Sequence, residues 1–170
     1  MLEIIDYSSR RGAIVPFLTK MHAVIKENSL RDKLAGMKPP EHVITWSQKM
    51  RKVLLDINRR FYIALDGQML AGVFFYRVDG GKAFIEDVQV AWAYRNNAHV
   101  IDGFLRKLEY DVSLKDSTFY ASERVKADAD AEMLASKGFK KKYVDGWEEL
   151  GTLSQASQAI KIRYSRGMGA

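Results

Sequence analysis

Cysteine is absent from all 170 residues of the chain. Its absence excludes disulfides, thiolate metal ligands and cysteine nucleophiles. Long hydrophobic runs are also missing, so no segment is expected to cross a membrane as a helix. The stretch before Phe17 places acidic residues ahead of basic ones and lacks the apolar core of a signal peptide. We therefore expect a cytoplasmic protein with no membrane partner.

Signals for metals and nucleic acids are equally sparse. The histidines His22, His42 and His99 stand far apart and fit no metal-ligand spacing, so no metal is expected. The net charge is +6, but the basic clusters are short and scattered, without a recognition-helix or RNA-binding aromatic pattern. Nucleic acid is therefore not the expected partner. The 47% hydrophobic content is enough to build the core of one soluble domain.

The hydrophobic periodicity changes along the chain. "LEIIDY" predicts a short strand, and apolar residues at helical spacing over 14–25 and 43–57 predict two helices. From Phe61 onward, alternating runs separated by glycine-containing turns predict three antiparallel strands. These turns are Asp66-Gly67 and Asp79-Gly80-Gly81.

A strand–helix–strand unit follows. A strand over 83–90, a helix over 100–113 and a strand over 117–122 form a crossover, which makes the two strands parallel in an otherwise antiparallel sheet. Ligands favour the carboxyl ends of such strands, where the next helix presents free N–H groups and its positive dipole end. The link from Arg95 to Val100 stands at this point, but it contains no glycine.

The C-terminal part of the sequence is less regular. "DADAEMLASKGF" predicts a short helix ended by Gly138, and "KKYVDGWEEL" a last strand bent at Gly146. We expect one domain over 1–150, and an extension over 151–170 that forms a strand with a frayed end or a partner-binding tail. If the chain forms a homodimer, we expect it to pair through this tail and the end of the sheet near Trp147.

Two stretches carry a resemblance to a known family. "VQVAWAYRNNAHVIDGFLRKLE" and "SERVKADADAEMLASKGF" resemble the GNAT superfamily of acyl-CoA-dependent N-acetyltransferases, as does the order of elements over about residues 2–150. The resemblance implies an α+β fold with three αβα layers. Its mixed, mainly antiparallel sheet would splay between the strands 83–90 and 117–122, with helices on both faces.

The resemblance also implies a site for acetyl-CoA as acyl donor. In the family, the end of the strand before the turn pairs with pantetheine, and backbone N–H groups of the turn bind the pyrophosphate. The positions concerned are Val88, Gln89, Val90, Arg95, Asn96, Asn97, Ala98, His99, Val100 and Ile101, with Asp128 as a further pantetheine contact. Ala98 replaces a family glycine. Val100 replaces glycine or alanine, and its β-branched side chain is expected to crowd the phosphates.

Amine acylation requires a neutral nucleophile, and a base near neutral pKa assists its formation. The resemblance places a catalytic glutamate at Glu123, and Glu86 on the neighbouring strand is the alternative base; partial burial of either would raise its pKa. Alternatively, Glu123 is a surface or salt-bridged carboxylate beside Arg124 and has no catalytic role. Ala135 stands where many members carry a tyrosine acid, so the leaving thiolate must obtain its proton elsewhere or leave unassisted. Tyr120 and Tyr143 are the substitutes considered.

Two functions remain open. The first is N-acetyl transfer from acetyl-CoA to an amine by direct attack, with a small amine, a polyamine, a lysine or a protein N-terminus as acceptor. The alternative is a catalytically weakened GNAT-like domain that acts as a CoA-binding or structural module. Binding of acetyl-CoA with and without turnover separates the two.

Overall fold

The computed structural model describes residues 1–8, 11–34, 56, 58–95, 98–122, 136–138 and 142–168. These residues form a seven-stranded sheet in the order β1-β2-β3-β4-β5-β7-β6. The strands are β1 (Leu2–Asp6), β2 (Arg59–Asp66), β3 (Met69–Asp79), β4 (Lys82–Val90), β5 (Thr118–Ala121), β6 (Tyr143–Val144) and β7 (Trp147–Gly151). All neighbours are antiparallel except β4 and β5. The predicted mixed sheet with one parallel crossover is therefore confirmed.

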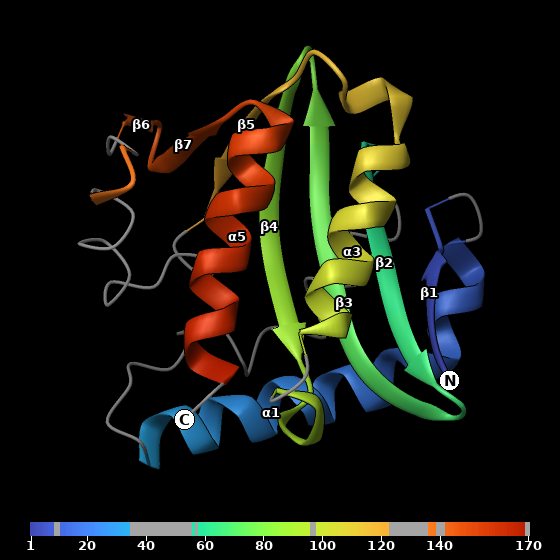
Figure 1. Cartoon of the computed structure of the whole chain (residues 1–170). Helices are drawn as coiled ribbons and strands as arrows, with labels where there is room; N and C mark the ends of the chain where they lie inside the picture. Colours follow the sequence, from blue (N-terminus) through green and yellow to red (C-terminus); the bar gives the residue numbers. More distant parts are fainter. Residues whose placement is uncertain are drawn as a thin grey trace.

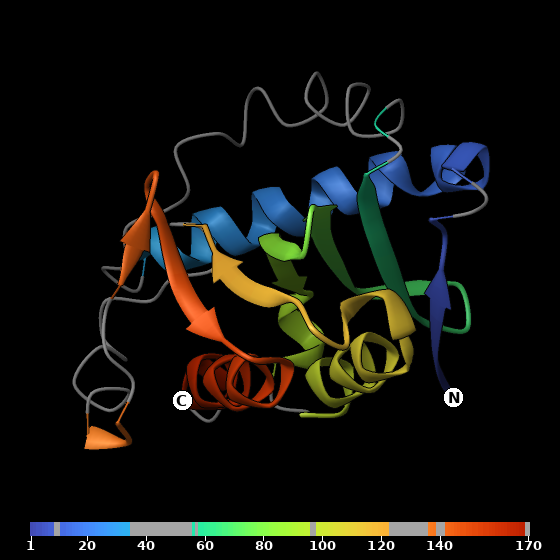
Figure 2. The same cartoon turned by 90° about the horizontal axis from the view of Figure 1, so that it is seen from above.

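Helices cover both faces of the sheet (Figures 1 and 2). On one face lies α1 (Leu18–Leu34), which follows the 3-10 helix η1 (Arg11–Phe17). On the other, α3 (His99–Tyr110) and α5 (Leu153–Met168) run side by side. Each face has its own core, because strand side chains alternate between the two layers. The predicted three-layer α+β architecture is confirmed.

The sequence patterns explain most of these elements. Asp66-Gly67 closes the β2–β3 hairpin with Gly67 at a φ of 61°, a conformation that glycine adopts without steric cost. The buried residues of α3 fall at helical spacing along one face: Val100, Ile101, Phe104, Leu105 and Leu108. Its end differs from the prediction. The α-helix stops at Tyr110, and Val112 is 88% exposed because the chain turns there into the 3-10 helix η3 (Val112–Leu114).

The last strand also differs. Instead of one strand bent at Gly146, the chain forms a β6–β7 hairpin. Asp145 and Gly146 both have positive φ, at 51° and 83°, which suits a two-residue hairpin turn. The same Asp-Gly turn signal that predicts the hairpin at 66–67 therefore also applies at 145–146.

The extension over 151–170 shows the largest departure from expectation. The strand or tail predicted there was wrong, because Leu153–Met168 forms the helix α5. Its Ala156, Ala159 and Ile160 belong to the same core as α3. Apolar residues at helical spacing in "LSQASQAIKI" carried this signal. Apart from residues 56, 136 and 137, the helices predicted over 43–57 and within 128–137 lie outside the described residues and stay predictions.

Candidate active site

Strands β4 and β5 part near the middle of β4. Their pairing runs from Lys82↔Thr118 to Ile85↔Ala121, and one further bond joins Ser122 N to Ile85 O at 3.1 Å. The residues from Glu86 to Val90 continue without a β5 partner among the described residues. We call this segment the open edge of β4. It begins at a bulge, since Ile85 and Asp87 face consecutive residues of β3.

The open edge presents backbone groups away from β3. Ala91 N donates to Ala71 O on β3 at 2.8 Å, so the alternation of a strand directs the N–H and C=O of Val88 and Val90 to the opposite side. The Val88 carbonyl accepts from the Tyr164 hydroxyl at 3.4 Å. The Val90 carbonyl accepts from Asn28 Nδ2 at 2.9 Å and from Arg95 Nε at 3.5 Å. Side chains from α1 and α5 therefore already reach this edge.

The start of α3 lies beside the open edge. Its N-cap, Ala98, makes no side-chain capping bond, so the first-turn amides have no such acceptor. Val100 is fully buried against Gly72, which pairs with Val90 on β4. A Cβ at Gly72 would lie 2.9 Å from Val100 Cγ1, so only glycine permits this approach. The crowding of phosphate expected from Val100 is not observed, because its side chain points into the core.

Positive charge gathers near this helix start. The guanidinium of Arg95 lies 4.7 Å from the Trp92 ring centroid, and that of Arg31 on α1 lies 4.9 Å from it. Trp92 belongs to the 3-10 helix η2 (Trp92–Tyr94), which links β4 to α3, and is 37% exposed. Arg31 also pairs with Glu27 at 3.0 Å. Two guanidinium groups therefore flank Trp92 in the link before α3, and cations near a helix N-terminus are suited to an anion.

A buried ion pair lies where α5 crosses β7. Arg163 Nη2 contacts Glu148 Oε2 at 2.9 Å, and both side chains are at least nine-tenths buried. The Arg163 Nε and Nη1 atoms are buried without a hydrogen-bond partner among the described residues, as is Oδ1 of Asn28. Buried polar atoms are normally paired, so such atoms near an open strand edge indicate a place for a ligand or water.

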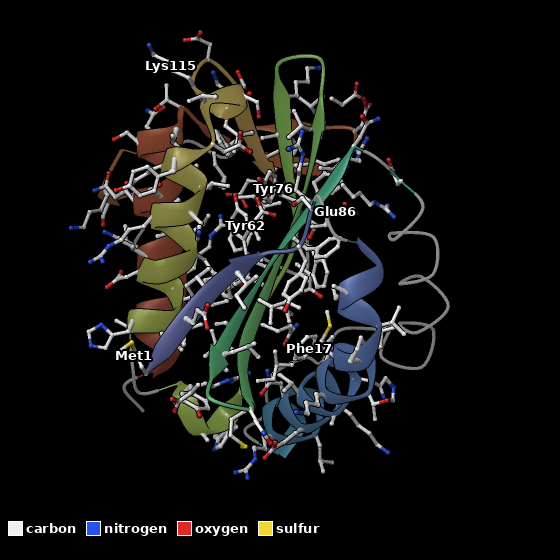
Figure 3. The ribbon with its side chains drawn as sticks, turned by 90° about the vertical axis from the view of Figure 1, so that its right-hand side faces the viewer. Met1, Phe17, Tyr62, Tyr76, Glu86 and Lys115 are labelled. Atoms are coloured by element: carbon white, nitrogen blue, oxygen red, sulfur yellow. The ribbon has the colours of Figure 1, made fainter. Side chains whose placement is uncertain are left out.

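Glu86 lies on the opposite side of the sheet from the Tyr62 and Tyr76 side chains (Figure 3). Its Oε1 lies 3.0 Å from Arg59 Nε, and the side chain is 23% exposed. Burial raises the pKa of Glu86 above its usual value, while Arg59 and Arg77 partly offset that rise. Ser122 Oγ donates to the Glu86 carbonyl at 2.7 Å, which holds the bulge against the end of β5.

The predicted site residues are partly assembled. Val88, Gln89, Val90, Arg95 and the stretch Ala98–Ile101 gather at the end of β4, and Glu86 lies on the same strand. Gln89 is buried toward α1, where Asn28 bonds to its side chain at 3.0 Å. Four further candidates, Glu123, Asn96, Asn97 and Asp128, lie outside the described residues and stay predictions.

The two tyrosines predicted as substitute acids lie in the core and on the edge strand of the sheet. Tyr120 is buried and stacks on Phe84 with 5.2 Å between ring centroids. Tyr143 is 47% exposed on β6, the edge strand of the sheet. Sequence reasoning missed Tyr164, Arg163 and Asn28. A helix predicted over 153–168 from its apolar spacing would have indicated that Arg163 and Tyr164 lie near the sheet.

A cavity of about 660 Å³ lies between the last turn of α3 and the first half of α5, at the other end of these helices from the open edge. Its lining includes Glu109, Lys115 and Lys161 but none of the candidate residues. The described His, Asp and Glu side chains form no group of three suited to a metal ion. No described helix has the length and hydropathy to cross a membrane.

No protein-family model matches the chain, and no curated protein sequence matches it. Solved structures resemble it at low identity. PaiA N-acetyltransferase from Thermoplasma acidophilum, in complex with coenzyme A, is 17% identical, with a TM-score of 0.59 over 88% of this chain and 96% of that chain. A GNAT-family acetyltransferase from Staphylococcus aureus is 14% identical, with a TM-score of 0.55 over 88% and 97%. A putative GNAT-family acetyltransferase from Desulfovibrio desulfuricans is 15% identical, with a TM-score of 0.54 over 88% and 95%. The predicted GNAT-like fold is therefore confirmed.

Proposed function

We propose that this protein is an acyl-CoA-dependent N-acyltransferase, which transfers an acetyl group from acetyl-CoA to an amine. The observation that carries the proposal is the start of α3, whose N-cap Ala98 makes no side-chain capping bond, beside the open edge of β4. The first-turn amides and the positive dipole end of a helix are suited to a diphosphate, and Arg95 and Arg31 place positive charge around Trp92 in the link before α3.

The open edge suits the other part of the cofactor. An extended arm containing amides can bind as an additional strand, by exchanging hydrogen bonds with backbone groups along a strand edge. Val88 and Val90 direct their backbone N–H and C=O groups away from β3. The fold shared with PaiA N-acetyltransferase, which was solved with coenzyme A, supports the same assignment.

Glu86 is the base in this proposal. The amine nitrogen attacks the thioester carbonyl, a C–N bond forms, and the C–S bond breaks. The Glu86 carboxylate accepts the proton that the amine loses, and the departing CoA thiolate takes up a proton. The raised pKa of Glu86 brings its basicity closer to that needed near neutral pH. The acceptor is a small amine or an amine of a protein.

Calorimetric titration with acetyl-CoA, followed by thiol-release assays with lysine, spermidine and a peptide N-terminus, tests the proposal. Absence of acetyl-CoA binding would reject it. Binding without release of thiol for any of the amines would instead favour the CoA-binding module.

A matched pair of variants locates the diphosphate. Ala98 is exposed, so Ala98→Asp and Ala98→Asn are expected to fold, and they differ essentially by one negative charge. We expect Ala98→Asp to bind acetyl-CoA about tenfold more weakly than Ala98→Asn, because a carboxylate repels the diphosphate. The difference should shrink as salt is added. Equal affinities of the two variants for acetyl-CoA would show that the diphosphate does not bind at the start of α3.

A further inference from the structure

The cavity between α3 and α5 lies at the end of the molecule opposite the open edge of β4. Helix α3 ends there and helix α5 begins there, and the two helices run side by side (Figure 1). Lys115, one of the lining residues, follows η3 at this same end (Figure 3). The volume of about 660 Å³ is within the range of sites for small molecules. Its lining shares no residue with the site proposed for acetyl-CoA, so a ligand bound here is a separate one.

One wall of the cavity is a single stripe of α5. Its residues follow one another at spacings of three and four, which places them on the same side of the helix: Ser154, Ser157, Gln158 and Lys161. The neighbouring stripe of α5 packs in the core, so the helix is held firmly beneath this wall. Two hydroxyls, an amide and an ammonium group therefore line one space.

Ser157 differs from the rest of the stripe in its burial. The residue is 7% exposed, and its Oγ is buried without a hydrogen-bond partner among the described residues. Buried hydroxyls normally have a partner, because an unpaired one costs free energy. A serine hydroxyl is redirected by rotation about one bond, so Ser157 can donate to an atom held in the cavity that it lines. This hydroxyl therefore favours a ligand that brings an acceptor.

The charged groups around the cavity do not pair with one another. Lys115 and Lys161 contribute two ammonium groups, and Glu109, in the last turn of α3, contributes one carboxylate. None of the three forms an ion pair within the part of the chain that the structure describes. The excess of positive charge favours an anionic ligand. The carboxylate can only accept hydrogen bonds, so it favours a donor on another part of the same ligand.

The start of α5 adds to the preference for an anion. Thr152 and Gln155 form a capping box, in which Thr152 N donates to Gln155 Oε1 at 2.9 Å and Gln155 N donates to Thr152 Oγ1 at 3.3 Å. Thr152, Leu153 and Ser154 all line the cavity, which therefore lies at the positive end of the helix dipole. A helix start with hydroxyls and lysines beside it suits a phosphate group.

We propose that this cavity binds a small phosphate monoester whose organic part carries hydroxyl groups. The two lysines and the Ser157 hydroxyl hold the phosphate at the start of α5, and Glu109 accepts a hydrogen bond from a hydroxyl of the organic part. The inference is independent of the proposed function, because the two sites have no residue in common.

Two-dimensional ¹H–¹⁵N NMR titrations with ribose 5-phosphate, inorganic phosphate and ribose test the site. Ribose 5-phosphate should shift the amides of Ser154, Ser157 and Lys161 saturably, with a Kd of about 1 mM or tighter. Inorganic phosphate should shift the same amides but bind more weakly, because it lacks the hydroxyl-bearing part that Glu109 contacts. Ribose should produce no saturable shift, since it lacks the phosphate.

Ser157→Ala distinguishes a binding role from a structural one. The Oγ has no hydrogen-bond partner among the described residues, so its removal should leave the midpoint of urea denaturation unchanged. The Kd for ribose 5-phosphate should nevertheless rise about five- to tenfold.

Lys161→Gln should raise the Kd for ribose 5-phosphate about tenfold, because it removes a cation from the site. The matched control is Lys26→Gln, which removes the same charge from an exposed position on α1, across the sheet. Its Kd should equal that of the wild type.

Saturable binding at the α5 amides, weakened by Ser157→Ala and Lys161→Gln but not by Lys26→Gln, supports the proposal. Absence of shifts at these amides overturns it, and so do shifts confined to the start of α3. Equal weakening by the two lysine variants also overturns it, since the attraction would then depend only on net charge. Equal affinity for ribose 5-phosphate and inorganic phosphate overturns the assignment to a monoester.

Discussion

Two polar clusters on the same face of the sheet differ in how fully they are bonded. Near the end of α3, Tyr62 and Tyr76 share a 2.7 Å hydrogen bond, and the Tyr76 hydroxyl donates to Asp111 at 2.8 Å. Both tyrosines are about 1% exposed, and burial raises the pKa of each above its usual value. Figure 3 shows the two rings between the sheet and α3. Each hydroxyl in this closed cluster has a partner.

The cluster at the open edge of β4 is different. Arg163 keeps one short contact with Glu148 and two buried donors without a described partner. The Tyr164 hydroxyl donates to the Val88 carbonyl over a long distance of 3.4 Å. A hydrogen-bond network in which every group is paired rigidifies a core. A partly paired network retains donors and acceptors that can bond to water or to a ligand. Among the described residues, hydrogen bonding is therefore more complete in the closed cluster than at the open edge of β4.

The largest expected effect is on the ion pair. Arg163→Met leaves the buried Glu148 carboxylate without its cation, which should lower the free energy of unfolding by about 3–5 kcal/mol. Urea denaturation measures the change. The double variant Arg163→Met with Glu148→Leu should recover most of it, because no unpaired charge stays buried. If the single variant were as stable as the wild type, the Arg163–Glu148 ion pair would not contribute to the free energy of unfolding, and the prediction would be wrong.

A smaller loss is expected in the closed cluster. Tyr76→Phe leaves the Tyr62 hydroxyl and Asp111 without their shared partner, and should cost about 1–3 kcal/mol of unfolding free energy. Coenzyme A affinity should not change, since the cluster lies away from the open edge. Tyr110→Phe, at an exposed tyrosine that ends α3, serves as the stability control. A change in affinity for Tyr76→Phe would show that the two clusters are coupled.

The smallest effect concerns Glu86, on the opposite face of the sheet. Because only the carboxylate accepts a proton, kcat/KM should fall as pH decreases through the raised pKa of Glu86. Arg59→Met removes a cation that favours the carboxylate, so the acidic limb of the profile should move to higher pH. The measurement is a pH–rate profile with an amine that the wild type acetylates. If the acidic limb of Arg59→Met lay at the same pH as that of the wild type, the limb would report the titration of a group other than Glu86.

The fold was more predictable than the site. The hairpin at Asp66-Gly67 and the buried face of α3 follow from turn chemistry and spacing within a few residues. The site depends on contacts that no local pattern reports. Val100 looked like an obstacle to phosphate until the structure showed it packed on Gly72. Whether a β-branched residue faces a ligand or the core depends on how the helix docks, which single-sequence reasoning did not determine.

A mixed sheet with one parallel crossover follows from local patterns, because periodicity and turn residues act over short stretches. The position of α5 beside the end of β4 does not follow from any local pattern, because it depends on how the helix docks on the core. Tyr164 and Val88 are separated by 76 positions, and their contact arises only when α5 buries its apolar face on the core. Packing brought the two groups together, since neither residue's immediate neighbours specify the other.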